Sequence, residues 1–487
     1  MVIAGHQDGI LIPAMDRLRE SSGRLRGVRL LHTHLGRACL TGEDLMDLVF
    51  LRLDSISVLT VDDKGAPNQF QWAHLMPRNR DRDPYRVYDP VDWSKGGVNH
   101  QASVESLEKE LGRDGDVHKD ISAEGNALLV SVDTRSRKEQ EKSIEELGSL
   151  ARTAGLNVAD SLIQRVSSIN PKSILGKGKV AELEVMALQS NASVLIFDRE
   201  LSPTQLRNLT SLTERKVIDR TQLILDIFAQ RATSRAGKLQ VEMAQLKYTL
   251  PRLIKQDRAL SRLTGGIGGR GPGETKLELD RRKIRDRISR IKNELQKLRR
   301  HRQNIRSKRV ETDIPVVSLV GYTNAGKSTL LNTLTRSSIL AEDKLFATLD
   351  PTSRRLRFPD EKEIVLTDTV GFIKDLPDDL REAFMATLEE LSLARVLVHV
   401  ADASHPEVEE QVNAVQELLI LLGLQNKPQL MVLNKWDMVQ DEKKQILQNV
   451  FRDAITVSAL EEKTLEPLVP ALEGMIIKNE KSDTLLY

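Results

Sequence analysis

The stretch GYTNAGKS, residues 321–328, constrains the possible folds of this chain more than any other part of the sequence. It follows IPVVSLVG, an apolar run typical of a buried strand, and leads into STLLNTLT, which begins like a helix. The pattern G-x-x-x-x-G-K-[ST] requires this context, because backbone N–H groups and a helix N-terminus then face a bound phosphate. The sequence therefore predicts an α/β unit that carries a phosphate-binding loop.

Each residue type in the loop suits a nucleotide and its metal ion. Glycines let the backbone approach the phosphates, Lys327 would reach the β- and γ-phosphates, and Ser328 would ligate Mg²⁺. We expect nucleotide contacts from the whole motif: Gly321, Tyr322, Thr323, Asn324, Ala325, Gly326, Lys327 and Ser328.

A second motif, NKWD at the end of a later strand, favours guanine over adenine. The Asp437 carboxylate can accept hydrogen bonds from guanine N1–H and the 2-amino group, a donor pair that adenine lacks. Asn434 would contact the base edge or tie its loop to the phosphate-binding loop, and the Lys435 stem would pack on the ring. SAL follows the next strand and would place a backbone N–H near guanine O6. The predicted guanine-side residues are Asn434, Lys435, Trp436, Asp437, Ser458, Ala459 and Leu460.

Two further loops would sense the γ-phosphate and order around it. Thr348 in FATLD would touch Mg²⁺ and the γ-phosphate side, with Thr352 as the competing candidate. Asp368 in DTVG would act on Mg²⁺ through a water molecule, and the Gly371 N–H would face the γ-phosphate. The predicted loop residues are Phe346, Ala347, Thr348, Leu349, Asp350, Asp368, Thr369, Val370 and Gly371. In this order the four motifs predict a GTP-hydrolysing domain, with catalytic roles for Lys327, Thr348 and Gly371.

Phe372 follows the glycine of DTVG, where Ras-type enzymes carry a glutamine that positions the attacking water. A phenylalanine cannot supply that hydrogen bond, so we expect slow intrinsic turnover that accelerates when a partner orders the loops. Asn324 stands where GTPases that use K⁺ in place of an arginine finger carry an asparagine. Its carbonyl oxygen is a candidate K⁺ ligand, and the alternative is a loop residue with no cation role.

Length and composition indicate a soluble cytoplasmic protein of two to four domains. The chain has 487 residues, 40% hydrophobic and 29% charged, with a single cysteine. We find no run of eighteen apolar residues and no secretory signal pattern. The predicted fold class is α/β. We predict an N-terminal extension over 1–125, with a mobile segment at 76–125, and a parallel α/β domain over 126–263. A linking segment over 264–310 would then lead into a GTPase domain over 311–487, whose mostly parallel sheet is flanked by helices.

The linking segment combines a glycine loop with a basic helix. TGGIGGRGPGET holds six glycines and one proline in twelve residues, which suits a hinge or a surface lying against RNA. From 274 to 309 the chain carries fifteen Lys/Arg against five Asp/Glu, beside an apolar stripe with coiled-coil spacing. Such a face is either simply solvated or neutralises RNA phosphates. The candidate RNA-contacting residues are Arg270, Lys276, Arg281, Arg282 and Arg285.

The run GGRGPGETKLELDRR, with VSLVGYTNAGKSTLLN and LFATLDPTSRR after it, resembles the HflX family of ribosome-associated GTPases. Upstream, ILGKGKVAEL, FDRELSPTQLRNL and VIDRTQLILDIFAQRA resemble that family's N-terminal domain. The resemblance spans about 127–480 and implies binding of a monomer to the large ribosomal subunit and its rRNA, ribosome-stimulated GTP hydrolysis with Mg²⁺, and in some members ribosome splitting under stress. Some members also bind ATP through the N-terminal domain, yet no second loop of the GYTNAGKS type is present. GKGK at 176–179 is a short basic glycine turn that would touch RNA phosphate or nucleotide, or be a turn without such a role. The chain ends soon after SAL, so we expect no long C-terminal extension.

One motif falls outside that resemblance. HTHLGRACLTGED, 32–44, faintly resembles the H-x-H-P…S-x-x-D zinc pattern of JAMM metallopeptidases, through His32, His34 and Asp44. Leu35 and Thr41 replace the proline and serine, and no upstream glutamate can be assigned. The alternative is a strand end followed by a helix capped by Thr41, within a helix-like stretch that runs from about 40 to 61.

Three functions therefore stay open: a GTP-switched ribosome-splitting or rescue factor, a GTP-timed RNA chaperone or ribosome-assembly factor, and an N-terminal metallohydrolase, active or relic.

Overall fold

The structure, a computed structural model, divides into two compact units, residues 1–223 and 224–487. It describes residues 27–36, 39–76, 85–95, 106–107, 125–213, 215–253, 276–310, 314–335, 345–346, 352–357, 363–368, 371–372 and 389–484. None of the helices in these ranges is long and apolar enough to cross a membrane.

The first unit begins with a small sheet in the order β1-β2-β3-β4, with β5 paired to β3. Strands β1 and β2 are parallel, and the others pair antiparallel. The elements are β1 (Arg29–Leu35), α1 (Gly42–Phe50), β2 (Ser55–Val61), β3 (Pro67–Leu75), β4 (Tyr85–Val87), β5 (Val91–Asp92) and η1 (Trp93–Lys95).

The expected helix-like stretch from 40 to 61 is wrong in its second half. Helix α1 ends at Phe50, and Arg52 adopts a left-handed backbone with φ of 49°. The following SISVLTV forms β2, because its β-branched residues suit a buried strand better than a helix. Most of the predicted mobile segment at 76–125 lies outside the described residues.

A four-stranded parallel sheet follows in the same unit, in the order β7-β6-β8-β9, as the alternation of strand and helix patterns predicted. Leu128, Val130, Leu195 and Phe197 form its buried core with residues of α4 and α5. The elements are β6 (Asn126–Asp133), α3 (Arg137–Thr153), β7 (Asn157–Arg165), α4 (Lys177–Gln189), β8 (Ala192–Phe197), α5 (Pro203–Leu212) and β9 (Lys216–Asp219). Helix α6 (Arg220–Arg231) follows, and the boundary between the two units falls within it.

The two sheets of the first unit share an apolar layer between α1 and α4. Leu48 and Val49 of α1 pack with Ala181, Val185 and Leu188 of α4 in one core cluster. The N-terminal residues are therefore joined to the parallel sheet by a continuous core.

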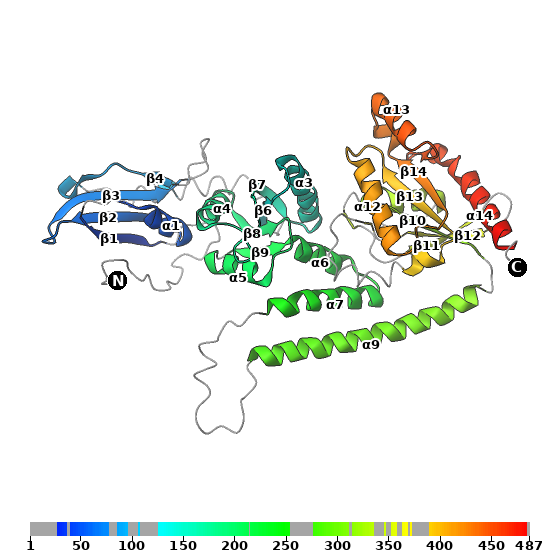
Figure 1. The fold of residues 1–487 in the computed structure, drawn as a ribbon, viewed down its shortest axis with the longest axis horizontal. Helices are drawn as coiled ribbons and strands as arrows, with labels where there is room; N and C mark the ends of the chain where they lie inside the picture. The colour runs from blue at the N-terminus through cyan, green and yellow to red at the C-terminus, as the bar shows by residue number, and fades with distance from the viewer. Residues whose placement is uncertain are drawn as a thin grey trace, which may run out of the picture. The chain divides into compact units, whose positions relative to one another are not determined.

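Helices α7 (Arg235–Arg252) and α9 (Lys276–Val310) lie side by side (Figure 1). Leu239 and Met243 of α7 pack on Ile291 of α9, and the predicted stripe through Ile288 and Leu295 lines the same contact. The expected helix with an apolar stripe is confirmed. The glycine loop at 264–275 lies outside the described residues.

The rest of the second unit is a six-stranded sheet in the order β11-β12-β10-β13-β14-β15. All neighbouring pairs are parallel except β11 and β12, so the predicted mostly parallel sheet is confirmed. The elements are β10 (Val316–Val320), α10 (Lys327–Thr335), β11 (Thr352–Arg357), β12 (Glu363–Asp368), η2 (Glu389–Leu393), β13 (Val396–Asp402), α12 (Val408–Leu421), β14 (Gln429–Asn434), η3 (Trp436–Met438), α13 (Asp441–Val450), β15 (Ile455–Thr456), η4 (Glu462–Leu465) and α14 (Leu468–Thr484).

Candidate nucleotide-binding site

The loop at 321–326 lies at the carboxyl end of the central strand β10 and leads directly into α10. Two of its positions require glycine for steric reasons. A Cβ at Gly321 would overlap the Val400 carbonyl oxygen on β13, and one at Gly326 would overlap the Asn434 side chain. Between them Asn324 has a left-handed φ of 62°, a conformation that asparagine tolerates better than most residues. The loop is thus held by the neighbouring strands.

The Lys327 side chain is buried under this loop. Its Nζ donates hydrogen bonds to the carbonyl oxygens of Gly321 and Tyr322, at 3.1 and 2.8 Å. Burial lowers the pKa of Lys327 to about 8, although the negative charge of Asp368 opposes the shift. The ammonium group is therefore already placed at the loop, where a phosphate would stabilise its charge.

Ser328 and Asp368, the two predicted magnesium-side residues, lie together. Strand β12 runs parallel to β10, with Leu319 opposite Asp368, which brings that carboxylate to the start of α10. The Ser328 hydroxyl donates to Asp368 Oδ2 at 2.6 Å, and Asp368 is fully buried. A hydroxyl and a carboxylate are the oxygen donors that Mg²⁺ prefers, so this pair fits the ion.

The DTVG loop is hydrogen-bonded to the phosphate-binding loop through Phe372. Thr323 N–H donates to the Phe372 carbonyl at 2.7 Å, and Phe372 N–H donates to the Gly321 carbonyl at 3.2 Å. A Cβ at Gly371 would lie 2.8 Å from Thr323 Cα and 3.2 Å from Lys327 Nζ. The predicted γ-phosphate sensor thus lies directly against the lysine, and the Phe372 side chain is buried.

Asn434 joins the guanine-side motifs to the phosphate-binding loop. Its Nδ2 donates to the Ala325 carbonyl at 2.8 Å, and its Oδ1 accepts from Ala459 N–H at 2.9 Å. Of the two roles considered for this residue, the structure places it in the second, as a tie between loops. The Asp437 side chain nearby is exposed and accessible to a ligand.

Lys435 adopts a left-handed φ of 58°, and its Nζ forms an ion pair with Asp402 Oδ2 at 2.7 Å. Trp436 begins η3 and packs partly buried on the core beneath it. In the SAL loop, Ser458 N–H donates to Thr464 Oγ1 at 2.9 Å, whereas Leu460 is exposed. Every predicted guanine-side residue therefore gathers at the carboxyl ends of β14 and β15.

Sequence reasoning missed several residues that support this site. Asp402 anchors Lys435, Thr464 holds the SAL backbone, and Thr333 Oγ1 donates to the Ala459 carbonyl at 2.6 Å. His399 is buried on β13, where burial and the charge of Lys327 lower its pKa to about 4. Only Asp402 had a signal, since it ends the predicted strand in RVLVHVADAS.

The loops around the γ-phosphate position are described only in part. Phe346 is buried, with its ring edge-on to Phe228 at 4.6 Å between centroids. Thr352, the competing candidate, begins β11 opposite Asp368. The following predicted residues lie outside the described residues: Ala347, Thr348, Leu349, Asp350, Thr369 and Val370.

The candidate RNA-contacting residues of α9 differ in their surroundings. Arg281 Nη2 donates to the Leu253 carbonyl at 2.9 Å, next to the end of α7. Arg282 and Arg285 are exposed. Lys276 begins the helix, and Arg270 lies outside the described residues.

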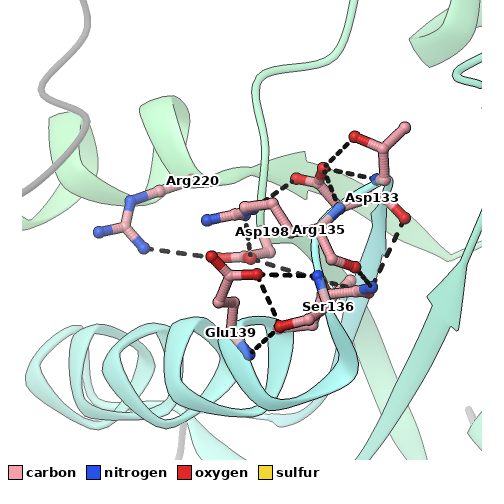
Figure 2. Close-up of polar contacts among 9 residues, drawn as sticks. Asp133, Arg135, Ser136, Glu139, Asp198 and Arg220 are labelled. Atoms are coloured by element: carbon pink, nitrogen blue, oxygen red, sulfur yellow. Dashed lines mark hydrogen bonds and ion pairs between the residues drawn. The ribbon is translucent and has the colours of Figure 1, made fainter.

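A separate polar cluster lies at the carboxyl edge of the parallel sheet in the first unit (Figure 2). Buried Asp198 pairs with Arg220 at 3.5 Å and with Arg135 at 3.6 Å, and Arg135 also pairs with Asp133 at 2.9 Å. Burial raises the pKa of Asp198, and both arginines oppose the shift. The charges of this cluster are thus largely satisfied within the protein.

GKGK forms the start of α4, with Gly176 as its N-cap.

Three family models match most of the chain from 141 onward. They are described as GTP-binding GTPase N-terminal over 141–229, GTP-binding GTPase Middle Region over 231–309, and 50S ribosome-binding GTPase over 316–435.

Curated relatives match at high identity. A "GTPase HflX" from Lacrimispora saccharolytica is 48% identical, over 74% of this chain and 84% of the relative. The "GTPase HflX" from Escherichia coli K12 is 48% identical, over 65% of this chain and 74% of the relative. Among solved structures, a GTP-binding protein from Sulfolobus solfataricus in complex with GDP is 26% identical with a TM-score of 0.40, covering 72% of this chain and 99% of that one.

Proposed function

Because the chain belongs to the HflX family of GTPases, a GTP-hydrolysing enzyme family, we propose that it binds the large ribosomal subunit and splits or rescues stalled or idle ribosomes. The observation that carries the nucleotide part is the Asn434 bridge, which joins the phosphate-binding loop to the guanine-side loop through buried hydrogen bonds. Two things support the ribosomal part: the family model over 316–435 is described as a 50S ribosome-binding GTPase, and helix α9 presents exposed arginines. A function on ribosomes places the protein, acting as a monomer, in the cytoplasm.

In this proposal the residues of the chain position the phosphates and the attacking water. Lys327 provides a positive charge at the β- and γ-phosphates, and Gly371 N–H faces the γ-phosphate. Ser328 and Asp368 would hold Mg²⁺, with Thr348 completing the set, and the bound ion would neutralise charge that develops on the phosphate oxygens. Asp437 selects guanine.

Phe372 would be the point at which a partner acts on the DTVG loop. Its carbonyl accepts from Thr323 N–H and its N–H donates to the Gly321 carbonyl, so the position of the loop end depends on these two backbone hydrogen bonds. We propose that a ribosomal partner accelerates turnover by changing these contacts and ordering the loop around the γ-phosphate.

The deciding experiment is sedimentation of intact ribosomes with the protein and GTP or a non-hydrolysable analogue. A splitting factor converts the 70S peak into subunits. The alternative, a GTP-timed RNA chaperone or assembly factor, leaves the 70S peak intact while it still binds the large subunit.

Phe372→Gln tests the role of the missing glutamine. We expect isolated Phe372→Gln protein to hydrolyse GTP about tenfold faster than wild type, since an amide can orient the water, which corresponds to about 1.4 kcal/mol in the barrier. Phe372→Leu is the matched control and should leave the intrinsic rate unchanged. Rapid turnover of the isolated wild-type protein, with no further gain from large subunits, would contradict this account.

The K⁺ hypothesis for Asn324 needs a separate measurement. Its left-handed backbone places the residue within the phosphate-binding loop, where its carbonyl oxygen could meet a cation between the β- and γ-phosphates. Ribosome-stimulated turnover should fall when Na⁺ replaces K⁺, and an unchanged rate rules the role out.

A further inference from the structure

His32 and His34 lie on the same face of the edge strand β1, because residues two apart in a strand point the same way. The alternate residues Leu31 and Leu35 are 64% and 61% exposed on the opposite face. The histidine side chains are only 9% and 20% exposed. The sheet therefore turns two imidazoles inward and leaves two leucines in solvent, the reverse of the usual apolar preference.

Asp44 reaches the same point from the first turn of α1. It is the third helical residue of a capping box, in which its Oδ2 accepts hydrogen bonds from the backbone N–H and the hydroxyl of Thr41, both at 2.7 Å. The cap fixes the rotation of the carboxylate and directs Oδ1 toward His32 Nε2 at 3.0 Å. The helix cap and the group of candidate ligands, which the sequence offered as alternatives, are thus both present, and the cap positions the Asp44 carboxylate.

The donor atoms are spaced as the ligands of one tetrahedral metal ion would be. The two Nε2 atoms are 3.1 Å apart, Asp44 Oδ1 lies 3.0 Å from His32 Nε2, and the other oxygen, Oδ2, lies 3.6 Å from His34 Nε2. Zinc bonds of about 2.0–2.1 Å at tetrahedral angles place neighbouring donors about 3.3–3.4 Å apart. The measured separations lie on both sides of that value.

Hydrogen bonds satisfy the His32 ring only partly. Its Nε2 faces both His34 Nε2 and Asp44 Oδ1. In a neutral imidazole one nitrogen either donates or accepts, so His32 Nε2 cannot donate to Asp44 and accept from His34 at the same time. The other ring nitrogen, His32 Nδ1, is buried and has no hydrogen-bond partner among the described residues. The ring therefore has no second hydrogen bond through that atom. A cation in the centre would bind all three lone pairs.

We propose that His32, His34 and Asp44 bind one zinc ion through His32 Nε2, His34 Nε2 and one carboxylate oxygen, with a coordination position left open to water. No fourth His, Cys, Asp or Glu joins the group in the parts of the chain that the structure describes. Three protein ligands and an open position are the pattern of catalytic zinc sites, whereas structural zinc has four. The three ligands lie in the first unit, whereas the nucleotide site is built from residues of the second.

The test uses the full-length, nucleotide-free protein and Zn²⁺ alone as the probe. After treatment with a chelator and dialysis, zinc is returned and its stoichiometry is measured by elemental analysis, and its affinity by competition with a chromophoric chelator. Wild type should bind one more zinc per chain than His34→Ala or Asp44→Asn. Asp44→Asn keeps the shape of the side chain and part of the cap, so its loss of zinc would not reflect loss of α1.

Matched controls separate metal binding from folding. Glu139→Ala removes the same capping motif from α3, where Ser136 is the cap, and should keep the full zinc content because Glu139 belongs to no group of possible metal ligands among the described residues. His405→Ala removes a histidine of the second unit and should also keep it. GTP affinity should be the same in His34→Ala, Asp44→Asn, Glu139→Ala and His405→Ala. Equal affinity would show that the second unit is intact in each of them.

Co²⁺ in place of zinc gives a second readout that needs no variant. Four-coordinate Co²⁺ with histidine ligands absorbs visible light far more strongly than six-coordinate Co²⁺, so wild type should become coloured on addition of Co²⁺. Equal zinc content in wild type, His34→Ala and Asp44→Asn would overturn the proposal. Failure of wild type to take up zinc or Co²⁺ would do the same and would leave a hydrogen-bonded cluster.

Discussion

Asn434 makes two hydrogen bonds that hold separate parts of the nucleotide site together. Its amide spans from the Ala325 carbonyl, before α10, to the Ala459 N–H, after β15. Asp437, three residues later, is exposed. The same short motif therefore contains one residue with a structural role and one that is available for recognition.

Substitutions at these two residues should separate stability from specificity. Asn434→Ala leaves a buried N–H and carbonyl without their partners and should cost about 1–3 kcal/mol in the free energy of unfolding, besides weakening GTP binding. Asp437→Asn should leave stability unchanged, weaken GTP binding and favour XTP, since an amide N–H matches the xanthine 2-oxo group. Denaturant unfolding without nucleotide and competition between GTP and XTP measure both effects. Equal destabilisation by the two changes would contradict the assignment.

The pKa of Lys327 predicts how GTP affinity depends on pH. Bound phosphates would stabilise the ammonium and raise its pKa above the value of about 8 that burial gives it. Affinity should thus be constant below pH 8 and fall above it, by up to about tenfold per pH unit. His399 is neutral in this range, because its pKa is about 4.

Lys327→Arg is the control for this profile, because arginine stays charged throughout the range. Any loss of affinity caused by ionisation of the guanine base would appear in both proteins. Fluorescent-GTP titration should show a loss beginning near pH 8 in wild type alone. Parallel profiles would exclude Lys327 as the titrating group.

At the scale of elements, α7 and α9 show how one helix can serve packing and recognition. Ile291 and its neighbours face α7, and Arg287 forms a bidentate ion pair with Glu242 at 2.7 and 2.8 Å. Arg285 lies on the exposed side. The net positive charge of the segment is therefore divided between intramolecular pairs and a face available to an anionic partner.

Removing an exposed arginine should weaken RNA binding without changing stability. For Arg285→Ala, the slope of log affinity against log salt concentration should fall by about 0.7–0.9 for each RNA phosphate that the protein no longer neutralises. Arg287→Ala, whose partner is Glu242, is the matched control and should leave the slope unchanged. Binding to large ribosomal subunits at several salt concentrations measures it. An effect of Arg287→Ala as large as that of Arg285→Ala would argue against a specific face.

At the scale of the whole molecule, the N-terminal sheet and the parallel sheet form one unit through the α1 and α4 layer. Leu48 is fully buried there. The second unit holds the nucleotide site on its own sheet, so GTP should stabilise it without a matching effect on the first unit.

Leu48→Ala should thus lower one thermal transition and leave the other in place. The cavity should cost about 2–5 kcal/mol, and calorimetry should show the loss in the transition that GTP does not raise. Leu31→Ala, on the exposed face of β1, is the control and should change little. A shift of the GTP-sensitive transition by Leu48→Ala would mean that the two units unfold together.

The sequence by itself determined the elements with strong local signals. Three patterns predicted their elements correctly: GYTNAGKS, NKWD and the apolar stripe on α9. The first two predicted loops at strand ends, and the third predicted a helix. Loop glycines, strand ends and helical spacing all depend on neighbouring residues in the chain. The end of α1 before Arg52 was not predicted. In a mostly apolar run, the spacing of apolar residues does not distinguish a helix from a following strand.

Only the tertiary structure decided which side chains meet. Asp402 anchors Lys435, Thr464 holds Ser458, and His32, His34 and Asp44 converge with donor separations of 3.0–3.6 Å. These contacts depend on strand register and on where one helix cap lies against an edge strand. Such distances of a few ångströms are set by the packing of strands, helices and loops, which local sequence patterns do not encode.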